Sequence, residues 1–133
     1  MTTTTTRSIE PDARADCPFC GIVAGELPAT IVREWADALA ILPRGGVGER
    51  GDHVLVLPRV HVATAIEDPV ITGMVSTRGA QLAAELGWTD ANLIYNVGPV
   101  GGQTVPHLHK HVLRRRLGDR LLMPWPQPLQ EAA

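Results

Sequence analysis

The sequence predicts an α+β domain in which short strands form an antiparallel sheet, and three observations lead to this fold class. The chain has 133 residues, about the length of one domain, and 44% of them are hydrophobic, which is enough for a core. Five short apolar runs have the length and composition of strands. One longer segment repeats its apolar residues at helical spacing, and several strands with one good helix are typical of α+β domains.

The N-terminal half is predicted to hold a short helical turn and three strands. Cys17–Gly25 has the pattern of a helical turn or knuckle, which its glycine and a following proline end. Ile31–Trp35 and Ala38–Leu42 are apolar runs separated by two residues, which predicts a hairpin. A glycine-rich loop over Pro43–Asp52 leads to a strand over His53–Leu57, which the next proline closes.

The C-terminal half is predicted to hold one long helix and two further strands. The helix begins at Asp68 and Pro69, because an N-cap side chain is followed by proline at the first helical position. Apolar residues then recur at roughly helical spacing until Gly87, which ends the helix. Ala91–Val97 predicts a strand, and Val105–Arg114 predicts another that a proline interrupts.

The ends of the chain and its composition limit the class of protein. Residues 1–15 lack an apolar pattern and predict a disordered tail, and the prolines that follow Arg116 predict an extended segment. The formal net charge of −2 argues against general nucleic-acid binding. No apolar run approaches about 18 residues and the N-terminus does not resemble a secretory signal, so we expect a cytoplasmic protein without a membrane span.

Three of the five histidines, His107, His109 and His111, fall within five residues. On a strand all three rings point to one face about 6.5 Å apart, whereas on a helix His109 faces away from the other two. Three imidazoles on one face are suited to phosphate chemistry, as nucleophile, base or hydrogen-bond donor, or to metal binding. The spacing allows both, and solvent-facing surface histidines are the remaining alternative.

Cys17 and Cys20 are the two cysteines of the chain and have the spacing C-x-x-C. Because no export signal is recognised before them, we expect metal binding or redox chemistry rather than a structural disulfide. The strand-to-helix context of a thioredoxin-type redox motif is absent, and two half-buried free thiols are a further alternative.

The histidine run and its neighbours together resemble a known family. Gly101–Leu113 resembles the signature of the histidine-triad (HIT) superfamily of nucleotide hydrolases and transferases. Further segments are similar to other parts of family members, the last of them to the C-terminal stretch of the Hint branch: Cys17–Pro28, His53–His61, Asn96–Gly98 and Leu122–Pro126. The resemblance implies a HIT-like fold with about five antiparallel strands, one long helix and a short N-terminal helix. This domain covers 16–126 and lies between tails over 1–15 and 127–133.

The resemblance also implies an activity. Family members cleave nucleoside phosphoramidates or related nucleoside 5′-phosphate derivatives through a covalent nucleotidyl-histidine intermediate. By position, His109 is the nucleophile that attacks the α-phosphorus, and His111 hydrogen-bonds the phosphate or the leaving group. The residues implied to contact the phosphate region are Asn96, Gly102, Gln103 and Thr104. Glycines at positions 101 and 102 fit this role, because the backbone must approach a phosphate closely.

Zinc is the cofactor that the resemblance implies. Some HIT proteins with an N-terminal C-x-x-C carry zinc at the positions that match Cys17, Cys20, His61 and His107. Two thiolates and two imidazoles form a closed tetrahedral site of the structural kind, and these ligand types suit Zn²⁺. In this interpretation the first histidine of the run binds the metal and leaves the other two for catalysis.

The chain departs from the family pattern at two places. Family members usually place an acidic residue for the ribose hydroxyls just after the second strand, where this chain has Pro43. Asp37, Glu49 and Asp52 are the candidates to replace that acid. Lys110 occupies a position of the histidine run that is usually apolar. Because this lysine faces away from the histidines on a strand, we expect it to mark a less covered sheet face or a contact with a partner chain.

The resemblance extends to partners and leaves alternative functions open. The expected ligand is a nucleoside phosphate or phosphoramidate, and a homodimer joined through the long helix and a sheet edge is favoured. His53 is expected to hydrogen-bond a loop rather than to take part in catalysis. A dinucleoside polyphosphate hydrolase of the same superfamily is one alternative function. A non-catalytic nucleotide-binding or zinc-stabilised interaction module is the other.

Overall fold

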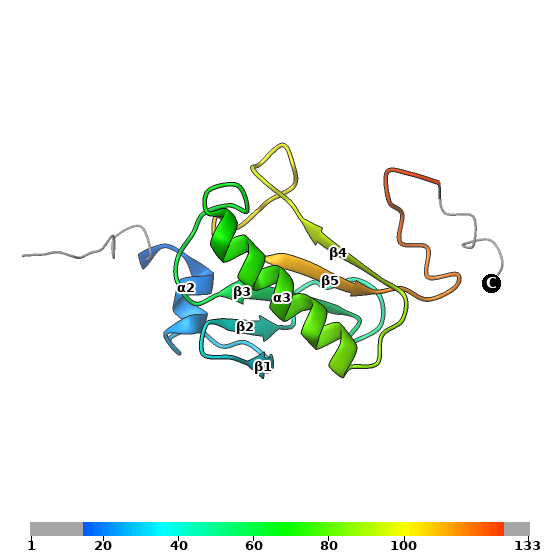
Figure 1. Ribbon diagram of the computed structural model, residues 1–133, viewed down its shortest axis with the longest axis horizontal. Coiled ribbons are helices and arrows are strands. Elements are labelled where there is room, and N and C mark those ends of the chain that lie inside the picture. The colour runs from blue at the N-terminus through cyan, green and yellow to red at the C-terminus, as the bar shows by residue number, and fades with distance from the viewer. Residues whose placement is uncertain (1–14, 127–133) are drawn as a thin grey trace, which may run out of the picture.

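The protein, described over residues 15–126 by a computed structural model, forms one five-stranded antiparallel sheet with two helices (Figure 1). The strands lie in the order β1-β2-β3-β5-β4, so β5, which contains the last histidine of the run, pairs with a strand on each side. The strands are β1 (Ile31–Glu34), β2 (Ala38–Ile41), β3 (His53–Pro58), β4 (Ala91–Tyr95) and β5 (Lys110–Arg114). The predicted α+β fold class with an antiparallel sheet is therefore confirmed.

Both helices begin where the sequence predicts. The short helix α2 (Pro18–Val23) has Cys17 as its N-cap, with a proline in the first turn. The long helix α3 (Pro69–Glu85) has Asp68 as its N-cap, and the Asp68 carboxylate accepts hydrogen bonds at 3.1 Å from two backbone N–H groups of the first turn. Gly87 follows α3 with a φ of 73°, a left-handed conformation that ends a helix at little cost.

The sheet has a separate apolar core on each face, because successive side chains of a strand point to opposite sides. On one face, α3 buries Val75 and Leu82 against alternate residues of β2, β3 and β5. On the other face, Phe19 of α2 packs against the intervening residues of β2 and β3. Figure 1 shows α3 lying across the sheet and α2 beside the ends of β2 and β3. The histidine run lies on the side of the sheet that α2 covers.

The last strand is shorter than predicted. The sequence predicts a strand over Val105–Arg114, but β5 begins at Lys110. Proline at position 106 has no N–H to donate to a ladder, and the His107 N–H instead donates to the carbonyl oxygen of Val105 at 2.8 Å. Residues 105–109 therefore form an irregular segment, with bends at 105–107, that leads into β5.

The prediction for Lys110 is wrong, because the face on which its side chain lies is covered. Lys110 is only 8% exposed, and its ammonium lies 4.8 Å from the centroid of the Tyr95 ring. The same ammonium is 3.4 Å from the hydroxyl of Ser76 in α3. Burial lowers the pKa of this lysine. The long alkyl stem is thus part of the packing between α3 and the sheet.

The two predicted tails fall mostly outside the described part of the chain. The N-terminal tail over 1–15 lies outside the described residues except for Ala15, and the C-terminal tail over 127–133 lies wholly outside them. Residues 116–126 contain no helix or strand, as the prolines predict. Among residues 15–126, none of the helices has the length and apolar character needed to cross a bilayer.

Candidate active site and metal site

The three clustered histidines lie side by side next to α2. The ring centroids of His109 and His111 are 5.2 Å apart, and the Phe19 ring contacts His107 and His109 at centroid distances of 5.8 and 5.0 Å. His107 is fully buried and His109 is 6% exposed. The alternative of solvent-facing surface histidines is therefore wrong, and the predicted gathering of the rings on one side is confirmed.

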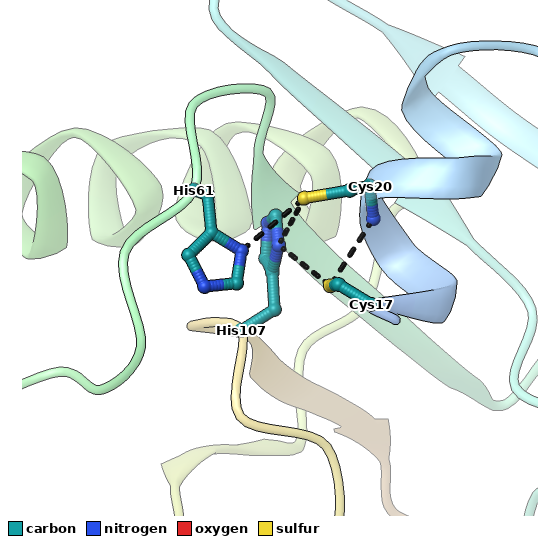
Figure 2. Close-up of side chains that lie close together, drawn as sticks. All are labelled: Cys17, Cys20, His61 and His107. Carbon is teal, nitrogen blue, oxygen red and sulfur yellow. Dashed lines mark hydrogen bonds between the residues drawn. The ribbon is translucent and has the colours of Figure 1, made fainter. Parts of the chain in front are cut away.

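Two cysteines and two histidines converge at the N-terminus of α2. The Sγ atom of Cys20 lies 3.2 Å from Nδ1 of His61 and 3.6 Å from Nδ1 of His107. The Sγ atom of Cys17 lies 3.4 Å from the same Nδ1 of His107. Figure 2 shows these four side chains pointing toward one common centre. Their ligand atoms all lie within 4.8 Å of one another, and the two cysteines are not joined in a disulfide.

This cluster fits a tetrahedral zinc ion. With Zn–S near 2.3 Å and Zn–N near 2.0–2.1 Å, a tetrahedron separates its ligand atoms by roughly 3.3–3.8 Å. The three sulfur–nitrogen distances, from 3.2 to 3.6 Å, are close to that range. The Nε2 of His107 lies 2.9 Å from the carbonyl oxygen of Pro58, which can only accept, so His107 carries its proton there. Its Nδ1 is then an unprotonated ligand that faces both sulfur atoms.

A cavity of about 750 Å³ opens beside the other two histidines. Its apolar wall comes mainly from α2 and from strands β2 and β3, including Phe19, Ile22, Ile41 and Leu55. Its polar side chains are Thr30, Arg44, Arg50, Thr104, His109 and His111. A mostly apolar cavity of this size with a few convergent polar groups is the usual form of a small-molecule site.

His109 is held with one ring nitrogen unprotonated. Its Nδ1 lies 2.8 Å from the carbonyl oxygen of His107, so the proton of a neutral His109 is on Nδ1. The lone pair is therefore on Nε2. Burial lowers the pKa of His109 and favours this neutral form near pH 7.

His111 is held in the opposite tautomer by His53. The backbone N–H of Val47 donates to Nδ1 of His53 at 3.1 Å, so a neutral His53 carries its proton on Nε2. That Nε2–H lies 2.9 Å from Nδ1 of His111 and donates to it, which leaves the proton of His111 on Nε2. Burial lowers the pKa of His111 to about 4 and lowers that of His53 as well. Both rings are therefore neutral near pH 7.

The contact between His53 and His111 is one that sequence reasoning missed. The predicted hydrogen bond from His53 to a loop is confirmed, because Val47 belongs to the glycine-rich loop before β3. In the sheet, however, His53 pairs with Leu113, which places His111 diagonally opposite on the same face. The alternation of both strands predicts a shared face, but only the register brings these two rings together.

Of the four residues predicted to contact the phosphate region, only Thr104 lines the cavity. The Gln103 amide oxygen accepts from the N–H of Gly98 at 3.0 Å, and its nitrogen donates to two backbone carbonyl groups at 2.8 and 2.9 Å. Gln103 therefore braces the turn that precedes the histidine run. Asn96 and Gly102 lie next to each other in that turn and are not among the residues that line the cavity.

The need for glycine at positions 101 and 102 is explained by the chain's own backbone. A Cβ atom at Gly101 would overlap the backbone carbonyl of Val97, and Gly102 has a φ of 94°. Side chains are excluded at Gly101 by the close approach of the chain to itself, and disfavoured at Gly102 by its backbone conformation. This cause differs from the close approach to a phosphate that was predicted from the sequence.

None of the three acids expected to replace the missing ribose carboxylate lines the cavity. Asp37 pairs with Arg78 at 3.0 Å, and Asp52 pairs with Arg116 at 2.8 Å. Glu49 lies 3.8 Å from the same Arg116. Asp37 and Asp52 therefore face arginines elsewhere, whereas Glu49 is exposed and lines a neighbouring hollow with Arg44 and Arg50, so its role stays a prediction. Among residues 15–126, no aspartate or glutamate lines the cavity.

Comparisons with known proteins agree with this geometry. The family described as the HIT domain matches residues 24–118. A HIT-like protein of Methanocaldococcus jannaschii is 37% identical over 112 residues, which cover 77% of this chain and 81% of that protein. An adenylylsulfatase of Arabidopsis thaliana is 32% identical over 111 residues, which cover 80% of this chain but only 55% of that protein. A zinc-bound histidine triad family protein from Mycobacterium smegmatis, 30% identical, superposes with a TM-score of 0.71 over 90% of this chain and 88% of its own.

Proposed function

The chain belongs to the histidine-triad (HIT) family, and from this premise we propose that it cleaves nucleoside phosphoramidates or related nucleoside 5′-phosphate derivatives through a nucleotidyl-His109 intermediate. One observation carries the proposal. The ring centroids of His109, whose Nε2 is unprotonated, and His111, whose Nε2 is protonated, are 5.2 Å apart, and both residues line one cavity. A nucleophile and a hydrogen-bond donor in such proximity are what phosphoryl transfer requires. The adenylylsulfatase among the relatives supports a hydrolase that acts on an adenylyl derivative.

The first step forms the bond to the enzyme. The Nε2 lone pair of His109 attacks the α-phosphorus, and the P–N or P–O bond to the leaving group breaks. The leaving group departs with the bonding electron pair and takes a proton from solvent. The substituted His109 ring becomes a cation, which the carbonyl oxygen of His107 stabilises through the 2.8 Å hydrogen bond to Nδ1. The Nε2–H of His111 donates to a phosphoryl oxygen or to the leaving atom.

The second step returns His109 to its original state. A water molecule attacks the phosphorus, the bond to Nε2 breaks, and the imidazole recovers its lone pair. The product is a nucleoside monophosphate, and the proton from water passes to solvent. Splitting one difficult displacement into two easier ones is the benefit of the covalent intermediate.

Zinc has a positioning role in this proposal. Cys17, Cys20, His61 and His107 would hold the ion, which supplies a structural crosslink and no reacting atom. His107 links this cluster to the site, because its ring faces the cysteines and its carbonyl fixes the tautomer of His109. The zinc-bound relative supports this assignment.

Activity is expected to depend on pH through His109. Nucleophilic attack needs the neutral ring, and burial lowers the pKa of His109 below its usual 6.5. A lowered pKa keeps the ring neutral to lower pH, so kcat/KM for an adenosine 5′-phosphoramidate is expected to stay level from pH 8 to about 6.5 and to fall only below that. A profile whose fall is centred at pH 7 or higher would contradict the buried neutral nucleophile.

Replacing His53 tests whether it sets the tautomer of His111. The variant His53→Phe removes the donor to Nδ1 of His111, and we expect kcat to fall about 10- to 100-fold while KM changes little. His53→Gln can still donate through its amide and is expected to recover part of kcat. A loss in His53→Gln as large as or larger than that in His53→Phe would contradict a role for His53 as the donor to His111.

A homodimer remains part of the proposal. The apolar side chains of Val70 in α3 and Leu93 in the edge strand β4 are 81% and 37% exposed, and Trp125 is 55% exposed. Exposed apolar groups on the long helix and on a sheet edge support the association predicted from the resemblance.

A further inference from the structure

We propose that the nucleotide taken by this site carries a second phosphate on its ribose, bound by Arg44 and Arg50. This inference rests on the proposed function, since it concerns the same cavity and names the class of nucleotide that fits it. The substrates would be nucleoside 5′-phosphate derivatives with a phosphomonoester at the 2′ or 3′ position. A phosphate on the ribose would make the ribose end of the nucleotide, rather than its leaving group, the part that determines specificity.

The charged groups of the cavity are all of one sign. These groups are Arg44 and Arg50, since His109 and His111 are neutral near pH 7 and no described carboxylate lines the cavity. Both arginines are exposed, and neither forms an ion pair or hydrogen bond with a described residue. Asp37 and Asp52 pair with other arginines, and Glu49, which lines a neighbouring hollow with Arg44 and Arg50, forms no ion pair with either of them. Two unpaired guanidinium groups on an otherwise apolar wall form an anion site that a plain ribose does not need.

The sheet register places these arginines on the ribose side of the cavity. Ile41 pairs with Leu55, and Leu55 pairs with His111, so the three residues form one row across β2, β3 and β5. Two strand spacings, about 9.6 Å, separate the ends of this row. The cavity reaches from His109 over Leu55 to the end of β2, so a nucleotide whose α-phosphorus lies at His109 has room to extend in that direction. The chain leaves β2 there, and Arg44 is the third residue after Ile41.

The chemistry at the end of β2 favours a phosphate over free hydroxyl groups. Pro43, which stands where the family usually has an acid, has no side-chain acceptor and no backbone N–H. Carboxylates accept hydrogen bonds from ribose hydroxyls, whereas guanidinium groups bind phosphate oxygens in pairs. In dinucleotide-binding folds the same exchange separates two cofactors, because an acid holds the free 2′-hydroxyl and an arginine accommodates the 2′-phosphate.

Calorimetric titration of the full-length zinc-loaded protein tests the inference with four nucleotides. Adenosine 5′-monophosphate is the reference, and the 2′,5′- and 3′,5′-bisphosphates of adenosine are the probes. We expect at least one bisphosphate to bind about tenfold or more tightly than the monophosphate at physiological salt. Adenosine 5′-diphosphate adds charge at the other end and is expected to gain much less. An equal gain with the diphosphate would overturn the assignment to the ribose.

Matched variants identify the groups responsible. Arg44→Ala with Arg50→Ala is expected to abolish the preference, so that the bisphosphate and the monophosphate bind with Kd values within about threefold of each other. Pro43→Asp is expected to reverse the preference, because it adds a carboxylate beside the ribose. Arg33→Ala is the control, since Arg33 lies in β1 and contacts Glu85 at the end of α3. A preference that survives loss of both cavity arginines would overturn the inference.

Turnover separates failure of this inference from failure of the proposed function. If adenosine 5′-phosphoramidate is hydrolysed through His109 but its 3′- and 2′-phosphorylated forms are no better in kcat/KM and bind no tighter, the function stands and the ribose phosphate is wrong. If none of these nucleotides binds or reacts, both are wrong.

Discussion

Replacing His109 with alanine is expected to lower kcat/KM for an adenosine 5′-phosphoramidate by about 10⁴-fold. The loss is large because the Nε2 lone pair is the attacking group, and the remaining donors can only bind the phosphate. Steady-state hydrolysis of the phosphoramidate measures the effect. Quenching in an alkaline denaturant during the first turnover should yield a nucleotide-modified protein with the native chain and none with the variant, because the P–N bond to histidine survives in alkali.

The structure provides a control for folding in this experiment. His109 is not one of the four clustered metal-binding candidates, so His109→Ala is expected to keep the same zinc content and circular dichroism spectrum as the native chain. A second variant, Thr104→Ala, changes a cavity side chain without touching the nucleophile and should lose far less activity. If His109→Ala and the native chain hydrolyse the substrate at equal rates, the nucleophile has been assigned wrongly.

Removal of zinc is expected to have the largest effect on stability. A metal that binds only the folded chain stabilises it by about 4 kcal/mol when its free concentration is a thousand times its Kd. For a chain of this length that corresponds to a fall in Tm of roughly 10–15 °C when a strong chelator removes the ion. Thermal unfolding followed by circular dichroism, with and without chelator, measures the shift. Metal analysis of protein purified without chelator should give one zinc per chain.

Two variants distinguish a zinc site from a pair of buried thiols. The double variant Cys17→Ser with Cys20→Ser removes both sulfur ligands, and its Tm is expected to be low and insensitive to chelator. The His109→Ala protein keeps all four groups and should respond to chelator as the native chain does. A native protein that contains no zinc and whose Tm is unchanged by chelator would show that the thiols alone fill this space.

The two effects are linked through His107. Its ring faces both cysteines, and its carbonyl oxygen accepts the hydrogen bond that fixes the tautomer of His109. Loss of zinc is therefore expected to lower activity as well as stability, even at temperatures where the chain stays folded. The same residue thus joins the structural and the chemical parts of the site.

Local patterns were sufficient to predict most elements of the fold. Asp68 and Pro69 specify a helix start through side-chain capping and a fixed φ, and both effects depend on adjacent residues alone. The start of the last strand was predicted too early. Because proline has no N–H to donate, strand pairing begins only at Lys110. The alternation of His107, His109 and His111 predicted their common side, although only the last of them lies in a strand.

By itself, the sequence determined the α+β class, the strand and helix positions, and the identity of the clustered cysteines and histidines, since all of these follow from spacing along the chain. Tertiary structure alone decided which groups meet across strands. The register set His53 against His111, and the packing of α3 buried Lys110. Tertiary packing also pairs Asp37 and Asp52 with arginines distant in sequence, and within residues 15–126 the cavity is lined by Arg44 and Arg50 and by no acid. Such pairings depend on the shifts between strands, and a change of one residue in register would exchange every partner.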